Sequence, residues 1–217
     1  MSGGEIRTPA EIERESMRII DAELSARGVV PPPERAAVVK RVIHATADFD
    51  YAETLRFTPD APSVLRGGTV VTDTNMALAG IGKPALARLG MSARCFMAEK
   101  EIAEAAKREG ITRAAASVEY ALRRYPGAAF AIGNAPTALL RLADLMEAGA
   151  RPALVIGVPV GFVNVEESKE RIWETCVRCG VPAIVAMGRK GGSGVAAAIC
   201  NALLYAAAGM SDPARRA

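Results

Sequence analysis

The stretch AAFAIGNAPTALL, residues 128–140, contains a short apolar run, a tight turn and the start of a helix. The run Ala129–Gly133 has the length of a buried strand. Pro136 fits the first turn of a helix, because the N–H that proline lacks would have no partner inside the helix. A strand that passes into a helix through a short turn is the repeating unit of a parallel sheet. The stretch therefore predicts an α/β protein.

Further apolar runs on both sides repeat this unit, with helical stretches between them. Right-handed crossovers restrict such a chain to a doubly wound sheet, either flavodoxin-like or Rossmann-like. We expect a three-layer α/β/α fold, flavodoxin-like, around a mostly parallel five-stranded sheet. The predicted strands are Thr69–Thr72, Arg94–Met97, Ala129–Gly133, Ala153–Val158 and Ala183–Met187. The predicted helices lie near Lys83–Leu89, Glu101–Arg124, Pro136–Ala148, Val165–Cys179 and Ser193–Ala208.

Two helices are predicted ahead of the sheet. In the first, Thr8 and Glu11 form a capping box around Pro9. Its apolar positions recur every four residues, so we expect Ser16 to lie on the inward face, with its hydroxyl bonded back to the helix or exposed to a pocket. These positions are Ile12, Ser16, Ile20 and Leu24. The second helix runs from about Glu34 to Ala47 and buries a stripe of Val38, Val39, Val42 and Ile43.

These elements predict a single domain over residues 1–217. Residues 1–50 form a helical extension and residues 69–209 form the sheet core. The segment between them, Phe49 to Gly68, contains two prolines and a glycine pair, and we expect it to be irregular.

Composition excludes several classes of protein. The net charge of +3 includes no long basic run, so a nucleic-acid surface is not indicated. The N-terminus has no apolar segment typical of a secretory signal. The most apolar stretch, Val195–Met210, is too short to span a bilayer comfortably and predicts a buried helix. Four cysteines in 217 residues do not suggest a disulfide scaffold, so we expect a cytoplasmic protein.

The turns that follow the strands are the expected ligand site, because ligands of doubly wound sheets lie beyond the carboxyl ends of the strands. The turn at Pro136 could present a helix N-terminus to an anion. GRKGGSG, residues 188–194, offers glycines and two cations but fits neither common nucleotide-binding spacing. It is either an anion site or a glycine-rich turn that leads into a closely packed helix.

His44 is the only histidine in the chain. Lys40, His44 and Asp48 follow one another at four-residue spacing, and Arg41 lies three residues before His44, so these polar groups share one face. Such a histidine is either a hydrogen-bonded structural residue or a group that gives and takes a proton. The local pattern leaves both interpretations open.

Other polar clusters favour no chemistry of their own. Cys176 and Cys179 form a C-x-x-C pair at a helix end, whereas redox pairs lie at helix N-termini. A zinc site would need two further ligands, so we interpret the pair as structural and predict no metal. The absence of a nucleophile elbow argues against a hydrolase. A cluster of charged residues is interpreted as the solvated start of a helix: Glu166, Glu167, Lys169 and Arg171.

Five motifs, in this order, resemble the precorrin-8X methylmutases. They are VIHATAD (42–48), TDTNM (72–76), GNAPTAL (133–139), PVGFV (159–163) with the following ESK (167–169), and GRKGGS (188–193). The resemblance covers about Ile12 to Tyr205. It implies a flavodoxin-like homodimer that moves a methyl group from C-11 to C-12 of a corrin precursor, giving hydrogenobyrinic or cobyrinic acid. The family acts on precorrin-8X or, in the cobalt-early branch, on cobalt-precorrin-8.

The resemblance also implies roles for individual residues. His44 takes the place of the catalytic histidine, and the chemistry agrees, because an intramolecular rearrangement needs a proton near neutral pH and no cofactor. The substrate is an apolar ring fringed with carboxylates, which calls for apolar walls and a polar rim. The substrate-binding candidates are Ser16, Arg41, Thr72, Thr74, Arg113, Asn134, Arg189 and Lys190. A tetrapyrrole carrier without activity is the alternative, and a nucleotide-binding regulatory domain, based on GRKGGSG alone, ranks last.

Overall fold

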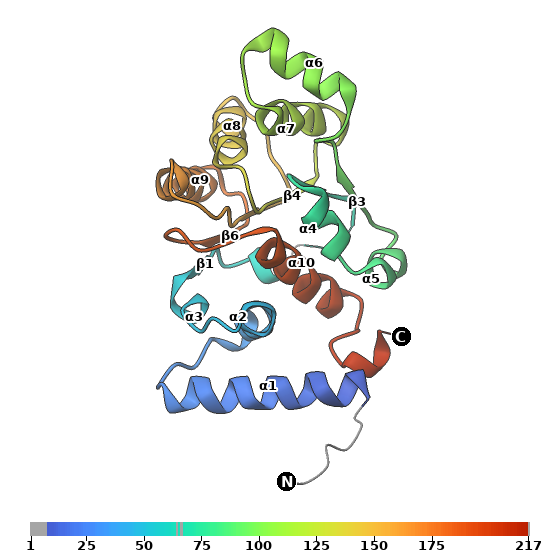
Figure 1. Ribbon diagram of the computed structural model, residues 1–217, viewed down its shortest axis with the longest axis vertical. Coiled ribbons are helices and arrows are strands. Elements are labelled where there is room, and N and C mark those ends of the chain that lie inside the picture. Colours follow the sequence, from blue (N-terminus) through green and yellow to red (C-terminus); the bar gives the residue numbers. More distant parts are fainter. Residues whose placement is uncertain (1–7, 64, 66, 217) are drawn as a thin grey trace.

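A twisted sheet of six strands forms the centre of the protein (Figure 1). The structure is a computed structural model and describes residues 8–63, 65 and 67–216. Within them the strand order is β1-β6-β5-β4-β2-β3, and only β1 is antiparallel to its neighbour. The strands are β1 (Leu55–Phe57), β2 (Thr69–Thr72), β3 (Ser92–Cys95), β4 (Ala129–Ile132), β5 (Leu154–Gly157) and β6 (Ala183–Ala186).

The five predicted strands are all present, with ends shifted by at most two residues, but the prediction of a five-stranded sheet was wrong. β1 adds an antiparallel edge strand inside the segment expected to be irregular. It is three residues long, and Arg56 points to solvent between two buried residues. Alternation over so short a run carries too little signal to separate a strand from a loop.

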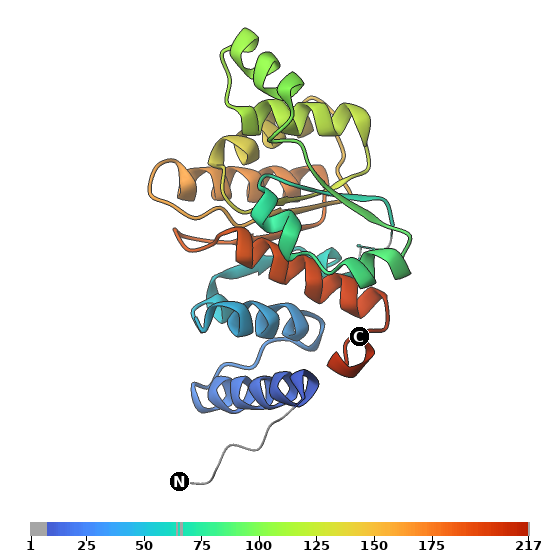
Figure 2. The same ribbon diagram turned by 45° about the vertical axis from the view of Figure 1, so that its right-hand side comes forward.

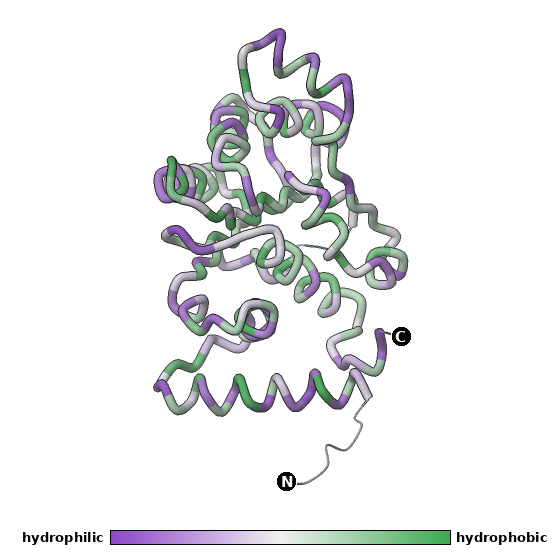
Figure 3. The backbone as a smooth tube through the Cα atoms, in the orientation of Figure 1, coloured by the Kyte–Doolittle hydropathy of each residue, from purple (hydrophilic) through white to green (hydrophobic). Residues whose placement is uncertain are grey.

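Helices cover both faces of the sheet, and the sheet separates the core into two clusters. α7 (Arg113–Arg124), α8 (Pro136–Glu147) and α9 (Val165–Cys179) pack on one face, where Phe130 and Val155 are buried. α4 (Asn75–Gly80), α5 (Lys83–Arg88) and α10 (Ser193–Ala207) pack on the other, against alternate strand residues such as Ala131 and Ile156. The central strands are hydrophobic along most of their length (Figure 3), as expected for a sheet buried on both faces.

The N-terminal helices form further layers outside α10. Figure 2 shows α10, α2 (Pro33–Thr46) and α1 (Pro9–Ala26) stacked one below another. α1 begins at the predicted capping box, in which Thr8 and Glu11 bond reciprocally. Short elements complete the described chain: α3 (Tyr51–Thr54), η1 (Ala61–Ser63), α6 (Lys100–Glu109) and η2 (Pro213–Arg215).

Three helix predictions need correction. The stretch expected to be one helix, Glu101–Arg124, is two, because Gly110 adopts a left-handed conformation (φ 66°) and Thr112 caps the start of α7. α4 was not predicted; it follows Thr74, whose hydroxyl caps it. Ile12 is not on a buried face, since its side chain is 54% exposed while Ile20 and Leu24 are buried.

Most of the apolar stretch Val195–Met210 is a buried helix, as predicted, because α10 lies between the sheet and α2; the helix ends at Ala207. Among the described residues, no helix is both long enough and apolar enough to cross a membrane.

The loops at the carboxyl edge of the sheet touch one another through their backbones. The Gly192 N–H donates to the Val158 carbonyl oxygen at 2.8 Å, and the Gly161 N–H donates to the Arg189 carbonyl oxygen at 3.2 Å. A Cβ on Gly191 would clash with the Val158 carbonyl oxygen, and one on Gly133 would lie 2.9 Å from backbone atoms of Gly192. The glycines of GRKGGSG therefore allow close packing between loops.

We predict that Gly191→Ala lowers the free energy of unfolding by at least about 2 kcal/mol, because backbone atoms cannot rotate away from the added methyl group as a side chain could. Gly194→Ala is the matched control. Gly194 lies three residues along in the first turn of α10, and its φ is not positive. Apart from its chain neighbours and the backbone of its own helix, no described atom lies within 4 Å of the position that an added methyl group would take. We expect this control to be neutral or stabilising. Urea unfolding of both variants tests this, and equal effects would contradict it.

Candidate functional site

The candidate site begins at the topological switch point, where the carboxyl ends of β2 and β4 lie side by side. Asp73 follows β2 and is only 3% exposed. Its carboxylate accepts hydrogen bonds from the backbone N–H groups of Gly133 (2.9 Å), Asn134 (2.8 Å) and Ala135 (2.7 Å). Burial raises the pKa of Asp73, and the three N–H donors oppose that rise. This one side chain fixes the turn between β4 and α8.

The expectation that the turn before α8 could face an external anion needs correction. The backbone N–H groups that precede α8 already bond to the Asp73 carboxylate, so an internal anion occupies this position. The prediction named Thr72 and Thr74 and missed the aspartate between them. An aspartate that directly follows a buried strand was the available signal.

Thr72 and Thr74 also stabilise the turns from within. Thr72 is fully buried, and its hydroxyl donates to the Thr74 carbonyl oxygen at 3.0 Å. The Thr74 hydroxyl caps α4 and lies 2.7 Å from the hydroxyl of Ser193, the first residue of α10. The side chain of Asn134, in contrast, is exposed and bonds to no described residue. Asn134 therefore offers a free amide group beside the switch point.

The loop from β6 to α10 contributes two cations, both already paired with acids. The Lys190 ammonium group lies 2.7 Å from Asp48 and 2.6 Å from Asp50, and this raises the pKa of Lys190 and lowers that of Asp48. Arg189 lies 3.1 Å from Glu166, with its guanidinium 5.8 Å from the centroid of the Phe162 ring. Because Asp48 and Asp50 follow α2, Lys190 ties this loop to the helix that carries His44.

His44 lies exposed on the last turn of α2, and its side chain makes no hydrogen bond or ion pair with any described residue. Lys40, His44 and Asp48 do not form the shared polar face that was expected, because Lys40 and Asp48 pair with residues elsewhere in the chain. Lys40 pairs with Asp21 at 3.0 Å, and the left-handed Ala47 (φ 54°) ends the helix before Asp48. A structural histidine would be buried or hydrogen-bonded, and His44 is neither.

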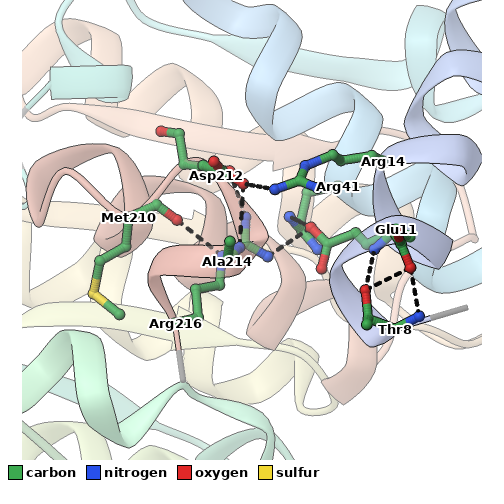
Figure 4. Close-up of polar contacts among 10 residues, drawn as sticks. Thr8, Glu11, Arg14, Arg41, Met210, Asp212, Ala214 and Arg216 are labelled. Carbon is green, nitrogen blue, oxygen red and sulfur yellow. Dashed lines mark hydrogen bonds and ion pairs between the residues drawn. The ribbon is translucent and has the colours of Figure 1, made fainter.

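Arg41 lies in a different setting from the loop cations. Arg41 and Arg216, both labelled in Figure 4, share the carboxylate of Glu13 (2.5 and 2.6 Å). Both guanidinium groups also lie against the Tyr205 ring. Burial opposes the two arginines, but together they lower the pKa of Glu13. A cavity of about 440 Å³ opens beside them between α1, α2, α10 and η2, with Met17, Ala202 and Pro213 among its walls.

The structure thus gathers some of the predicted residues and separates others. Ser16 lies outside the cavity lining, and its hydroxyl donates to the Ile12 carbonyl oxygen at 2.9 Å. Arg113 is exposed at the start of α7 and lines a groove beneath α6. Three contacts join the loops at the carboxyl edge to one another and to the end of α2: Asp73 with the β4 turn, Thr74 with Ser193, and Lys190 with Asp48. The joined segments carry the remaining predicted residues, His44, Thr72, Thr74, Asn134, Arg189 and Lys190.

Lys169 corrects another prediction. The sequence placed it in a solvated helix start, but its side chain is fully buried beneath the loop from β6 to α10. Its ammonium group donates to the carbonyl oxygens of Gly188 (2.6 Å) and Lys190 (2.8 Å). Glu166 and Glu167 are exposed, as expected.

Known proteins resemble this chain over most of its length. Residues 11–206 match the family described as precorrin-8X methylmutase. A cobalt-precorrin-8 methylmutase of Salmonella typhimurium is 44% identical over 209 residues, 92% of this chain and 96% of that protein. A precorrin-8X methylmutase of Pseudomonas aeruginosa is 38% identical over 206 residues, 91% and 96% of the two chains. The solved precorrin-8X methylmutase of Thermus thermophilus superposes with a TM-score of 0.79 at 39% identity, covering 91% of this chain and 98% of that one.

We predict that Asp73→Asn lowers the free energy of unfolding by at least roughly 2 kcal/mol, because an amide oxygen cannot replace both carboxylate oxygens and its NH₂ group would face backbone donors. Asp60→Asn is the matched control, since that side chain is exposed and accepts no hydrogen bond from a described residue. Urea unfolding of the two variants provides the comparison. An equal, small effect at both positions would show that the Asp73 bonds contribute little.

Proposed function

This chain belongs to the precorrin-8X methylmutase family, and we propose that it moves the methyl group at C-11 of precorrin-8X or cobalt-precorrin-8 to C-12. It is an isomerase of cobalamin biosynthesis. The product, hydrogenobyrinate or cobyrinate, has the same atoms as the substrate. The protein must therefore bind the ring, hold it in position and move a proton.

His44 is the proposed general acid–base. It protonates the conjugated ring, which makes the ring electron-poor enough for the methyl group to migrate, and takes a proton back afterwards. The observation that carries this assignment is that the only histidine is exposed and has no partner among the described residues. It lies four residues before Asp48, the acid through which Lys190 ties the β6 loop to the end of α2.

The loops around the switch point supply the proposed substrate contacts. Arg189 and Lys190 bind peripheral carboxylates by exchanging their present acidic partners for the substrate, and Asn134 donates from its free amide. Exposed Met76 and Phe162 offer apolar surface to the ring face. Ser16, Arg41 and Arg113 remain candidates on the surrounding elements; the hydroxyls of Thr72 and Thr74 act mainly on the shape of the turns. No cofactor is part of this proposal.

A tetrapyrrole carrier is the competing proposal, since a carrier would use the same loops to bind its ligand. The two differ in outcome: an isomerase releases a chemically distinct product, whereas a carrier returns its ligand unchanged. Incubation of the purified protein with precorrin-8X and, separately, with cobalt-precorrin-8 distinguishes them and identifies the preferred substrate. The four free cysteines are compatible with the cytoplasmic location that we infer.

We predict that His44→Asn reduces the single-turnover rate by about 10²- to 10⁴-fold, the usual contribution of a positioned acid–base group. Product affinity and melting temperature should stay near wild type, because an exposed side chain contributes little to packing. Ala45→Asn is the matched control, since it places the same amide at the next exposed position of α2. Near-wild-type turnover in His44→Asn would rule out this mechanism.

We also predict that the active form is a homodimer whose interface includes the exposed loop Val160–Val163. Phe162 and Val163 are 84% and 76% exposed, so this loop offers apolar surface that a contact with a second chain would bury. Val163→Asp should shift the mass measured by light scattering toward the monomer and lower activity. Val30→Asp, at an equally exposed valine in the elbow between α1 and α2, should do neither. A fully active wild-type monomer would contradict this prediction.

A further inference from the structure

Lys169 on α9 is the only lysine or arginine among the described residues that is fully buried. Burying a cation is costly unless its donors find acceptors. Lys169 has two, the carbonyl oxygens of Gly188 and Lys190. Burial lowers the pKa of Lys169 to about 8. The neutral amine still has two N–H donors, so both carbonyls remain satisfied in either protonation state.

These contacts hold a loop whose two cationic side chains pair with exposed acids. Gly188 and Lys190 flank Arg189, and the carbonyl oxygen of Arg189 accepts from the Gly161 N–H at 3.2 Å. Three successive carbonyl groups are therefore bonded, two to the buried ammonium group and one to the backbone of the loop after β5. The side chains of Arg189 and Lys190 meanwhile extend to Glu166 and to Asp48 and Asp50 at the surface.

A role in core packing alone does not explain a lysine here. An apolar side chain of similar length would fill the same space without the cost of desolvating an amine. It would, however, leave the Gly188 and Lys190 carbonyl oxygens buried without a donor. What a lysine adds at this position is a fixed loop backbone.

We propose that Lys169 is a positioning residue for the methyl transfer: it holds the backbone of Gly188–Lys190 so that Arg189 and Lys190 present their cations to the substrate carboxylates. Lys169 itself does not touch the substrate. This inference rests on the proposed function of the two cations.

The test compares Lys169→Met with the control Ser168→Ala. Ser168 is the neighbouring buried residue of α9, and its hydroxyl bonds to the Val165 carbonyl oxygen and not to the loop. Lys169→Met should raise KM about tenfold or more, the equivalent of one charge-assisted hydrogen bond, with kcat nearly unchanged. Assays well below the melting temperature separate this effect from global unfolding. Lys169→Gln, which keeps two N–H donors on a shorter chain, should recover part of the affinity and is the substitute if Lys169→Met does not fold.

A combination of variants tests whether Lys169 acts through the two cations. In the Arg189→Ala/Lys190→Ala background, Lys169→Met should cause little further rise in KM, because the groups that it positions are gone. A full additional rise would overturn the proposal, as would wild-type KM in the single variant.

Amide hydrogen exchange provides a readout that does not depend on the corrinoid. The Gly161 amide, bonded to the Arg189 carbonyl, should exchange faster in Lys169→Met than in Ser168→Ala, while amides of β4 are unchanged. If the wild-type protein fails to convert either corrinoid, the proposed function fails, and exchange still decides whether Lys169 fixes the loop. Equal Gly161 protection in both variants would refute the positioning role.

Discussion

The carboxylate of Asp73, buried between two strand-to-helix turns, is the contact on which the candidate site depends. A parallel sheet brings the carboxyl ends of β2 and β4 together, but it leaves the turns free to adopt many shapes. Three N–H donors on one carboxylate restrict the β4 turn to a single shape and set the direction in which Asn134 points. The buried ammonium group of Lys169 holds the loop after β6 in a similar way, by donating hydrogen bonds to two of its carbonyl oxygens. One buried anion and one buried cation thus fix the backbone conformation of two neighbouring loops.

The sequence predicted the repeating elements well, because each has a local cause. Thr8 and Glu11 cap α1, Pro136 begins α8, and five apolar runs become the parallel strands. The sequence did not predict features whose cause is a contact with a distant part of the chain. β1 is a strand only because β6 lies beside it, and Lys169 is buried only because the β6 loop covers it. The residues next to Lys169 in the sequence do not indicate that a distant loop will cover its side chain.

The same reasoning applies to the site. His44, Asn134, Arg189 and Lys190 were identified from motifs and lie on connected elements, whereas Ser16 and Arg113 have no described bond to them. Asp73 was missed because an aspartate in a turn is common, and only tertiary packing shows which N–H groups it accepts from. The partners of the loop cations were also not predictable. Asp48 and Asp50 are separated from Lys190 by 142 and 140 positions in the chain.

The backbone contact between Gly191 and the turn after β5 limits how this site could be redesigned. Two main chains that touch directly have no side chains between them that could be exchanged for larger or smaller ones. The spacing of these loops is consequently a fixed property of the scaffold. Altered selectivity for the fringe of a macrocycle would have to come from outward-facing positions such as 134, 162 and 189, which a library could vary while leaving the glycines unchanged.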